Sequence, residues 1–315
     1  MRAAFALAAV LCLLGGCGGD DPPAKAPAPA ERAGRDIYEY DRLAPLGFRD
    51  RGVVNRRYPV EVHDVSYSSP RGGRVSAYLV VPPGEGPFPA VVYLHGSGGS
   101  RIDFLAPATW LAGRRAVALT IDSAFARARL ASFPQGLAGI RKQRDLEVQT
   151  IVDLRRAVDL LQSLSYVDGD RLGFVGLSAG ARSGAILAGV ERRIKAFVLM
   201  SGRGVSAETY AAAAPRSLRA QVLRLLRQTD ELRYVARSAP SRLFFQLGRR
   251  DEIVPRAALV RLFRAAGRPK QVRWYSAGHV LNAQAHRDQL RWLSSELPVR
   301  GPPVPGALTD PPPGY

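Results

Sequence analysis

The chain has very few cysteines for its length. Cys12 and Cys17 are the only two thiols in 315 residues, which excludes a disulfide scaffold and any zinc site built on several thiolates. No apolar run reaches the roughly 20 residues that a membrane-spanning helix needs. Hydrophobic residues make up 46% of the chain and charged residues 23%, which excludes a wholly disordered protein. The composition therefore predicts a globular protein.

Lysine is also scarce, with four lysines against 41 arginines, and the net charge is +18. Such a charge can attract nucleic acid or an anionic membrane surface. However, no basic block alternates with aromatic residues, as a nucleic-acid groove requires. We therefore expect solvated arginines on the surface and no nucleic-acid partner.

The N-terminal segment has the pattern of an export signal. Arg2 supplies a positive charge, residues 3–14 are apolar, and small residues precede Cys17. This resembles the signals of bacterial lipoproteins, which are cut before a cysteine that then carries lipid. The resemblance implies a signal peptide over 1–16, a lipidated Cys17 and a flexible tether over 17–35. It predicts a lipoprotein anchored in the bacterial cell envelope; an ordinary signal peptide would give a secreted or periplasmic protein.

Between the tether and a Pro/Gly-rich tail over 300–315, residues 36–299 have the length of a single α/β domain. Apolar patterning predicts strands over 60–67, 74–81, 90–94, 116–121, 172–175, 194–200, 243–247 and 272–275. It predicts helices over 146–164, 179–190, 257–266 and 283–297. This alternation indicates a mostly parallel, twisted sheet with helices on both faces. The insertion 203–229 is either a surface helix or a small helical lid.

A candidate nucleophile lies between a predicted strand and a predicted helix. Residues 176–180 form the pattern Gly-x-Ser-x-Gly around Ser178. In that context the pattern predicts a sharp turn that exposes the serine hydroxyl, and the backbone N–H of Ala179 then points to a developing oxyanion.

A serine hydroxyl needs a base, and the chain has four histidines. His279 follows a predicted strand and a small flexible segment, so it is our candidate base. His95 directly follows the strand 90–94 and is expected to brace its loop. His63 is expected on the surface, and His286 has no motif around it.

The base in turn needs a carboxylate that fixes its tautomer. Asp251 follows the apolar strand 243–247 and gives the chain order Ser…Asp…His. Glu252 is the alternative acid. Asp122 precedes the nucleophile and is expected to be structural or part of a pocket wall. Asp168 and Asp170 are expected in a turn.

Residues 60–297 resemble the α/β-hydrolase fold, specifically the branch of dienelactone hydrolases and acetyl xylan esterases that borders the prolyl-oligopeptidase-like enzymes. The matching stretches are 89–96, 167–180, 248–251 and 278–279. The resemblance implies that the N–H of Ser97 completes the oxyanion hole, and that neither a metal nor an organic cofactor is needed. Dienelactone hydrolases use a cysteine where this chain has Ser178, so an ester or thioester substrate fits better than dienelactone.

These observations predict a serine esterase that acts on a small-molecule ester, most simply a short-chain acyl ester, through Ser178, His279 and Asp251. A peptidase or an acyltransferase on the same three residues is one alternative. A catalytically inactive binding protein of the envelope is another. Arg101, Arg182, Arg249 and Arg250 lie near these motifs, and we expect them to be solvated. The sequence does not predict an oligomeric state.

Overall fold

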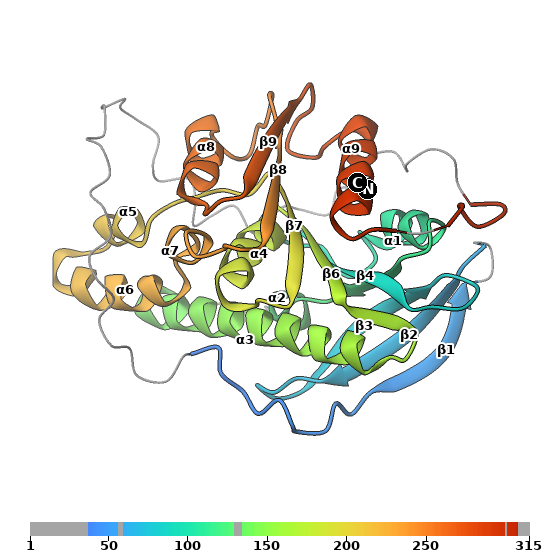
Figure 1. Ribbon diagram of the computed structural model, residues 1–315. Coiled ribbons are helices and arrows are strands. Elements are labelled where there is room, and N and C mark those ends of the chain that lie inside the picture. Colours follow the sequence, from blue (N-terminus) through green and yellow to red (C-terminus); the bar gives the residue numbers. More distant parts are fainter. Residues whose placement is uncertain (1–36, 56–58, 129–133, 300, 308–315) are drawn as a thin grey trace, which may run out of the picture. The chain divides into compact units, whose positions relative to one another are not determined.

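The computed structural model describes residues 37–55, 59–128, 134–299 and 301–307. The predicted signal peptide 1–16, Cys17 and the tether 17–35 lie outside the described residues. Within the described part, nine strands form a single sheet, and helices lie on both sides of it (Figure 1).

The sheet is mostly parallel, which confirms the predicted fold class. Its order is β1-β2-β3-β5-β4-β6-β7-β8-β9. The first three strands pair antiparallel, β3 is antiparallel to β5, and the six strands from β5 to β9 are parallel to one another. The strands are β1 (Arg49–Asn55), β2 (Glu61–Ser68), β3 (Arg74–Val81), β4 (Phe88–Leu94), β5 (Val117–Ile121), β6 (Val167–Leu177), β7 (Ile194–Met200), β8 (Arg242–Gly248) and β9 (Lys270–Tyr275).

Helices connect the parallel strands, as right-handed crossovers of this kind require. They are α1 (Leu105–Ala112), α2 (Ala124–Arg127), α3 (Gly136–Ser163), α4 (Ala179–Val190), α5 (Ala207–Ala212), α6 (Arg219–Leu226), α7 (Glu231–Val235), α8 (Arg256–Ala265) and α9 (Ala283–Glu296). Among the described residues, no helix is both long enough and apolar enough to cross a membrane.

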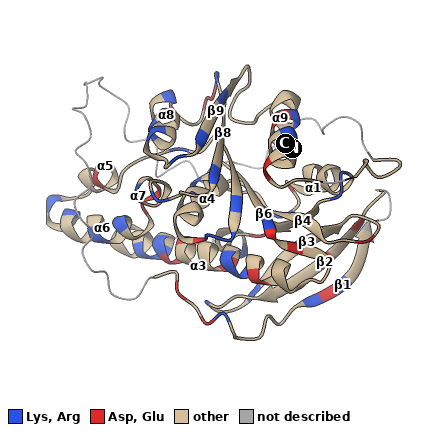
Figure 2. Cartoon of the chain, viewed as in Figure 1, with Lys and Arg blue, Asp and Glu red and all other residues tan. Residues whose placement is uncertain are grey.

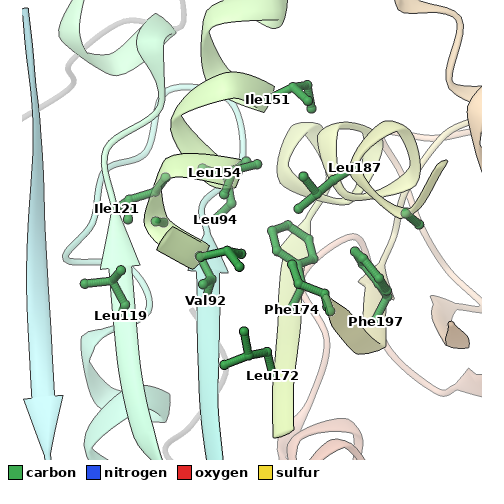
Figure 3. Close-up of a cluster of buried hydrophobic side chains, with 14 of the residues drawn as sticks. Val92, Leu94, Leu119, Ile121, Ile151, Leu154, Leu172, Phe174, Leu187 and Phe197 are labelled. Atoms are coloured by element: carbon green, nitrogen blue, oxygen red, sulfur yellow. The ribbon is translucent and has the colours of Figure 1, made fainter. Parts of the chain in front are cut away.

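One face of the sheet packs on α3 and α4. Figure 3 shows Phe174 of β6 between the strands and Leu187 of α4, with Ile151 and Leu154 of α3 beside them. These side chains are fully buried. Burial of each large apolar side chain contributes about 1.5–3 kcal/mol, so this layer holds the long helix against the strands that carry the site.

The opposite face packs on α1 and α9. The alternate residues of the same strands point there, among them Tyr93 and Val175, and they contact Phe104 before α1 and Leu293 of α9. Because successive side chains of a strand point to opposite faces, a continuous apolar run is what a strand covered on both sides requires.

The structure differs from the sequence predictions at several element boundaries. Strand β1 and helices α1 and α2 were not predicted, and α3 begins at Gly136, ten residues before its predicted start. Strand β6 begins at Val167, so Asp168 and Asp170 lie in a strand and the predicted turn is wrong. The pairing of β4 with β6 shifts register in this part, and the N–H of Asp170 donates to Oδ1 of Asp168. An irregular strand start explains the turn-like sequence.

The described part of the C-terminal tail, residues 301–307, packs against the end of α1. The N–H of Val304 donates to the carbonyl oxygen of Gly113 at 2.7 Å, and the Arg115 guanidinium donates to the carbonyl oxygen of Pro302 at 2.9 Å. Val304 is buried. This segment has neither helix nor strand, yet it covers part of the molecule.

We predict that buried His286 makes folding stability pH-dependent. Burial lowers its pKa to about 4, although a hydrogen bond with Gln289 opposes the shift. A histidine in the unfolded chain takes up its proton near pH 6.5, so the unfolded state binds more protons between pH 6.5 and 4. Stability is therefore lost as the pH falls through that range, by about 2 kcal/mol at pH 5.

The measurement compares urea unfolding of the wild type and His286→Gln at pH 7.5 and pH 5.0. The cost of the substitution itself and the titration of all other groups cancel in the double difference. We expect the stability gap between the two proteins to shift by about 2 kcal/mol in favour of the variant at pH 5.0. An unchanged gap would contradict the prediction.

Candidate active site

Ser178 lies at a strained turn between β6 and α4. Its φ is 54° and its ψ is −110°, a conformation that residues other than glycine rarely adopt. Such a residue costs about 1–3 kcal/mol and persists only where its surroundings hold it. Here the N–H of Ser178 donates to the carbonyl oxygen of Met200 at 2.8 Å. The carbonyl oxygen of Ser178 accepts from the backbone N–H of Arg182 at 3.0 Å. The turn places the serine at the carboxyl end of β6.

The two glycines of the motif provide space, whereas the serine itself takes the strained backbone. A Cβ atom on Gly180 would lie 2.2 Å from the carbonyl oxygen of Leu94, and one on Gly176 would lie 2.4 Å from that of Gly180. Both distances are far below van der Waals contact. The motif therefore needs glycine because the start of α4 lies directly against the end of β4.

The structure brings Asp251 to His279. The Nδ1 atom of His279 lies 3.0 Å from both carboxylate oxygens of Asp251. The His279 side chain is 7% exposed and that of Asp251 2%. Since Nδ1 donates to the carboxylate, Nε2 of His279 has its lone pair available for a proton. This is the arrangement of a general base.

The carboxylate of Asp251 is held in its ionised form. Burial alone pushes the pKa of Asp251 up, but the hydrogen bonds from His279 and from two backbone N–H groups outweigh it, and the net pKa is lowered. Those N–H groups belong to Ile253 and Val254, at 3.0 and 2.8 Å. An ionised Asp251 stabilises a positive charge on the imidazole.

The backbone of His279 is held from both sides. The carboxylate of Glu252 accepts from its N–H at 3.1 Å, and the hydroxyl of Ser201 donates to its carbonyl oxygen at 2.8 Å. Glu252, the alternative acid, thus contacts the main chain of the base, while Asp251 contacts its ring. Ser201, which directly follows β7, was not predicted as a site residue because a lone serine after a strand carries no distinctive signal.

The loop after β4 lies next to the serine. A Cβ atom on Gly96 would be 3.5 Å from the Cβ of Ser178, and Ser97 is the next residue of this loop. The His95 ring fixes this loop, because its Nε2 accepts from the N–H of Ser123 at 3.1 Å and its Nδ1 donates to the carbonyl oxygen of Gly96 at 2.7 Å. His95 therefore has both ring nitrogens engaged.

Ala179, the second residue predicted to bind an oxyanion, is the first residue of α4. The first four N–H groups of a helix have no partner within the helix, so the N–H of Ala179 is available to a ligand. The positive end of the helix dipole lies at the same place. The start of α4 thus presents a backbone donor next to Ser178.

The remaining predicted residues lie elsewhere. His63 contacts Asp50 and Glu61 on β1 and β2. Asp122 accepts from the N–H of Arg101 at 2.7 Å, which agrees with a structural role. Within the described residues, no group of three or more histidine, cysteine or carboxylate side chains is placed to hold a metal ion.

Two of the four arginines near the motifs are ion-paired, so the expectation that they are solvated is wrong for Arg101 and Arg182. Arg101 donates to Asp64 at 2.7 Å and lies over the ring of Tyr78. Arg249 and Arg250 are exposed. The ionic partners could not be seen in sequence because they lie far along the chain.

Arg182 joins its own helix, α4, to α3 and to the insertion after β7. Its guanidinium contacts the carboxylate of Glu147, that of Glu231 at 3.1 Å and the carbonyl oxygen of Thr229 at 2.9 Å. Both carboxylates are at most 4% exposed. Breaking a buried ion pair costs about 3–5 kcal/mol, because one charge is left without a partner.

The same cluster fixes the insertion 203–229. The N–H of Val205 donates to Glu231 at 3.0 Å, and the hydroxyl of Ser183 donates to Glu147 at 2.6 Å. Figure 1 shows α6 beside the N-terminal half of α3, which it contacts. Of the two interpretations of this insertion, these buried contacts favour a fixed surface helix over a moving lid.

Comparison with known proteins agrees with the observed fold. Residues 54–201 match the acetyl xylan esterase family. The acetyl xylan esterase of Paenibacillus sp. R4 superimposes with a TM-score of 0.71 at 21% identity, over 83% of this chain and 91% of that one. Acetyl xylan esterase 1 of Thermoanaerobacterium sp. superimposes with a TM-score of 0.70 at 17% identity, over 82% and 90%.

The chain has the α/β-hydrolase fold. In sequence, it is 30% identical over 176 residues to acyl-coenzyme A thioesterase 3 of Mus musculus, which is 56% of this chain and 33% of the relative. This chain thus spans about a third of the length of the curated relatives it matches. The matched range contains Ser178 and ends before Asp251 and His279.

We predict that Asp251 and Glu252 contribute very unequally. Asp251→Asn removes the acceptor that fixes the His279 tautomer, and we expect it to slow labelling of Ser178 by a fluorophosphonate roughly 10³- to 10⁴-fold. Glu252→Gln keeps an oxygen that accepts from the His279 N–H, and we expect less than a threefold change. Labelling rates measured by intact-protein mass spectrometry check this, with Ser178→Ala as the unlabelled control. Equal losses in both variants would refute the assignment of Asp251.

Proposed function

We propose that this protein is a serine hydrolase that cleaves carboxylic esters through an acyl-enzyme. The observation that carries the proposal is the Asp251–His279 pair at the carboxyl end of the sheet that also presents Ser178 on a strained turn. The match of residues 54–201 to the acetyl xylan esterase family supports it independently.

The proposed reaction begins when Nε2 of His279 takes the proton of the Ser178 hydroxyl as its oxygen attacks the acyl carbonyl. The N–H groups of Ala179 and Ser97 donate to the oxyanion that forms. His279, whose positive charge Asp251 stabilises, then gives the proton to the leaving alkoxide. Water deprotonated by His279 attacks the acyl-enzyme and releases the carboxylic acid, which regenerates Ser178.

The proposed substrate is an ester with a short acyl chain. The names of the matching family and of the two similar structures, all acetyl xylan esterases, support an acetyl-sized group. A thioester is the second candidate, because the sequence relatives include acyl-coenzyme A thioesterases. The same residues serve both reactions, since a thiolate leaves more readily than an alkoxide.

We predict that p-nitrophenyl esters from acetyl to palmitoyl are hydrolysed with a maximum at short chains. Ser178→Ala keeps a Cβ atom at the strained turn but removes the proposed nucleophile. We therefore expect kcat to fall roughly 10⁴- to 10⁶-fold. Initial rates of wild type and variant check this, with acetyl-coenzyme A as the thioester arm. Near-normal turnover by the variant would refute Ser178 as the nucleophile, and no turnover by the wild type would favour the peptidase, transferase or binding alternatives.

We further propose that the mature protein is anchored to a membrane of the cell envelope through lipid on Cys17. The support is the order of charge, apolar run, small residues and cysteine at the N-terminus. Cys17→Ser should shift the expressed protein from the membrane to the soluble fraction. Cys12→Ser, a matched change within the predicted signal, should leave it in the membrane fraction. Membrane association that survives Cys17→Ser would contradict the anchor.

A further inference from the structure

The segment that leaves β7 passes beside the nucleophile turn. Its first carbonyl, that of Met200, accepts from the N–H of Ser178 at 2.8 Å. Two residues later, a Cβ atom on Gly202 would lie 2.9 Å from the Cβ of Ala181 in the first turn of α4. The next residue, Arg203, therefore begins close to the site and carries the first long side chain of the insertion.

Arg203 is a half-buried cation without an ionic partner. Among the residues that the structure describes, no carboxylate pairs with it; its guanidinium lies 5.5 Å from the centre of the Tyr210 ring in α5. Arg182, by contrast, forms ion pairs with Glu147 and Glu231. In contrast to Arg182, Arg203 has no carboxylate partner among the described residues, and its guanidinium donors are available to a ligand.

The hydroxyl of Tyr210 is buried and has no hydrogen-bond partner in the described structure. Buried polar groups are nearly always paired, so an orphaned hydroxyl calls for an explanation. Burial raises the pKa of Tyr210, although Arg203 opposes the shift, and the phenol therefore keeps its proton at neutral pH. It is a neutral donor beside a free cationic donor.

Arg203 and Tyr210 lie on a segment that buried contacts hold in place. The contact of Val205 with Glu231, and that of Glu231 with Arg182, tie the segment after β7 to the nucleophile helix. The N–H of Ala207, the first residue of α5, donates to Asp230 at 3.1 Å, which fixes the helix that carries Tyr210. Donors on a rigid segment lose little conformational entropy when they bind a ligand.

We propose that Arg203 and Tyr210 form a subsite for a carboxylate carried by the substrate. The proposal rests on the esterase function proposed above and adds its substrate class, an ester with a free carboxylate at some distance from the scissile bond. One guanidinium and one neutral hydroxyl balance a single negative charge, which fits a carboxylate better than a doubly charged phosphate. The bound carboxylate accepts from both groups and satisfies the buried hydroxyl of Tyr210.

The test uses two matched pairs of esters. p-Nitrophenyl butyrate and the p-nitrophenyl monoester of glutaric acid differ by a carboxylate on the acyl side. Phenyl acetate and 4-acetoxybenzoate differ by one on the alcohol side. The measured quantity is the ratio of kcat/KM for the anionic ester to that for the neutral ester within each pair, which cancels effects common to both.

In at least one pair, we expect Arg203→Gln to lower this ratio roughly tenfold or more, the usual effect of a lost hydrogen bond to a charged group. We expect Tyr210→Phe to lower it about threefold or more. Arg219→Gln, on α6 of the same insertion, removes the same charge from a side chain whose guanidinium donates to the carbonyl oxygen of Ala214. It should leave the ratio within twofold of wild type.

Three results would overturn the subsite. One is a ratio unchanged in Arg203→Gln, as expected if Arg203 serves only to pack against the ring of Tyr210. Another is an equal loss in Arg219→Gln, which would indicate a long-range effect of net charge. The third is a wild type that hydrolyses the neutral esters but rejects both anionic ones. If the wild type hydrolyses neither member of either pair, the esterase function itself fails.

Discussion

The close approach of two backbones at Gly180 is the constraint on which the rest of the site depends. A side chain there would meet the carbonyl oxygen of Leu94 at 2.2 Å, so the start of α4 and the end of β4 touch directly. That contact sets Ser178, just before α4, beside the loop that follows β4. The buried layers on both faces of the sheet hold the two elements together, and the strained φ of Ser178 persists within this packing.

The parts of the fold that could be predicted are those whose cause is local in the sequence. Central strands covered on both faces appear as continuous apolar runs, and β7 was predicted at its observed bounds. Helix α1 has a proline at Pro107 and no side-chain cap, and six of its residues are buried, so tertiary packing forms it. Strand β1 is an edge strand with two register shifts and Gly52, which erases the alternation by which a strand is recognised.

The candidate site likewise combines features that are local in the sequence with features that depend on contacts between distant residues. The motif around Ser178, and the order of Asp251 and His279, could be recognised because each lies directly after a predicted strand. The structure then brings Asp251 and His279 into contact. The choice between Asp251 and its neighbour Glu252 needs three-dimensional information, since both follow the same strand. So does the role of Ser201, whose hydroxyl holds the His279 backbone across 78 residues of sequence. Contacts at such separation leave no local pattern.

The arginine content acquires a structural meaning once these long-range contacts are known. Figure 2 shows Lys and Arg on α3, α6 and α8. Several arginine side chains contact residues of other elements. Arg156 of α3 is 2% exposed and donates to carbonyl oxygens of Arg42 and Ala44, and Arg193 joins Asp159 to Glu191. A guanidinium can bridge in this way because its five donors lie in a fixed plane, whereas a lysine ammonium is a single strongly hydrated point charge. Arginine thus joins separate elements of the fold as well as charging its surface, whereas Arg203 is half-buried and has no carboxylate partner among the described residues.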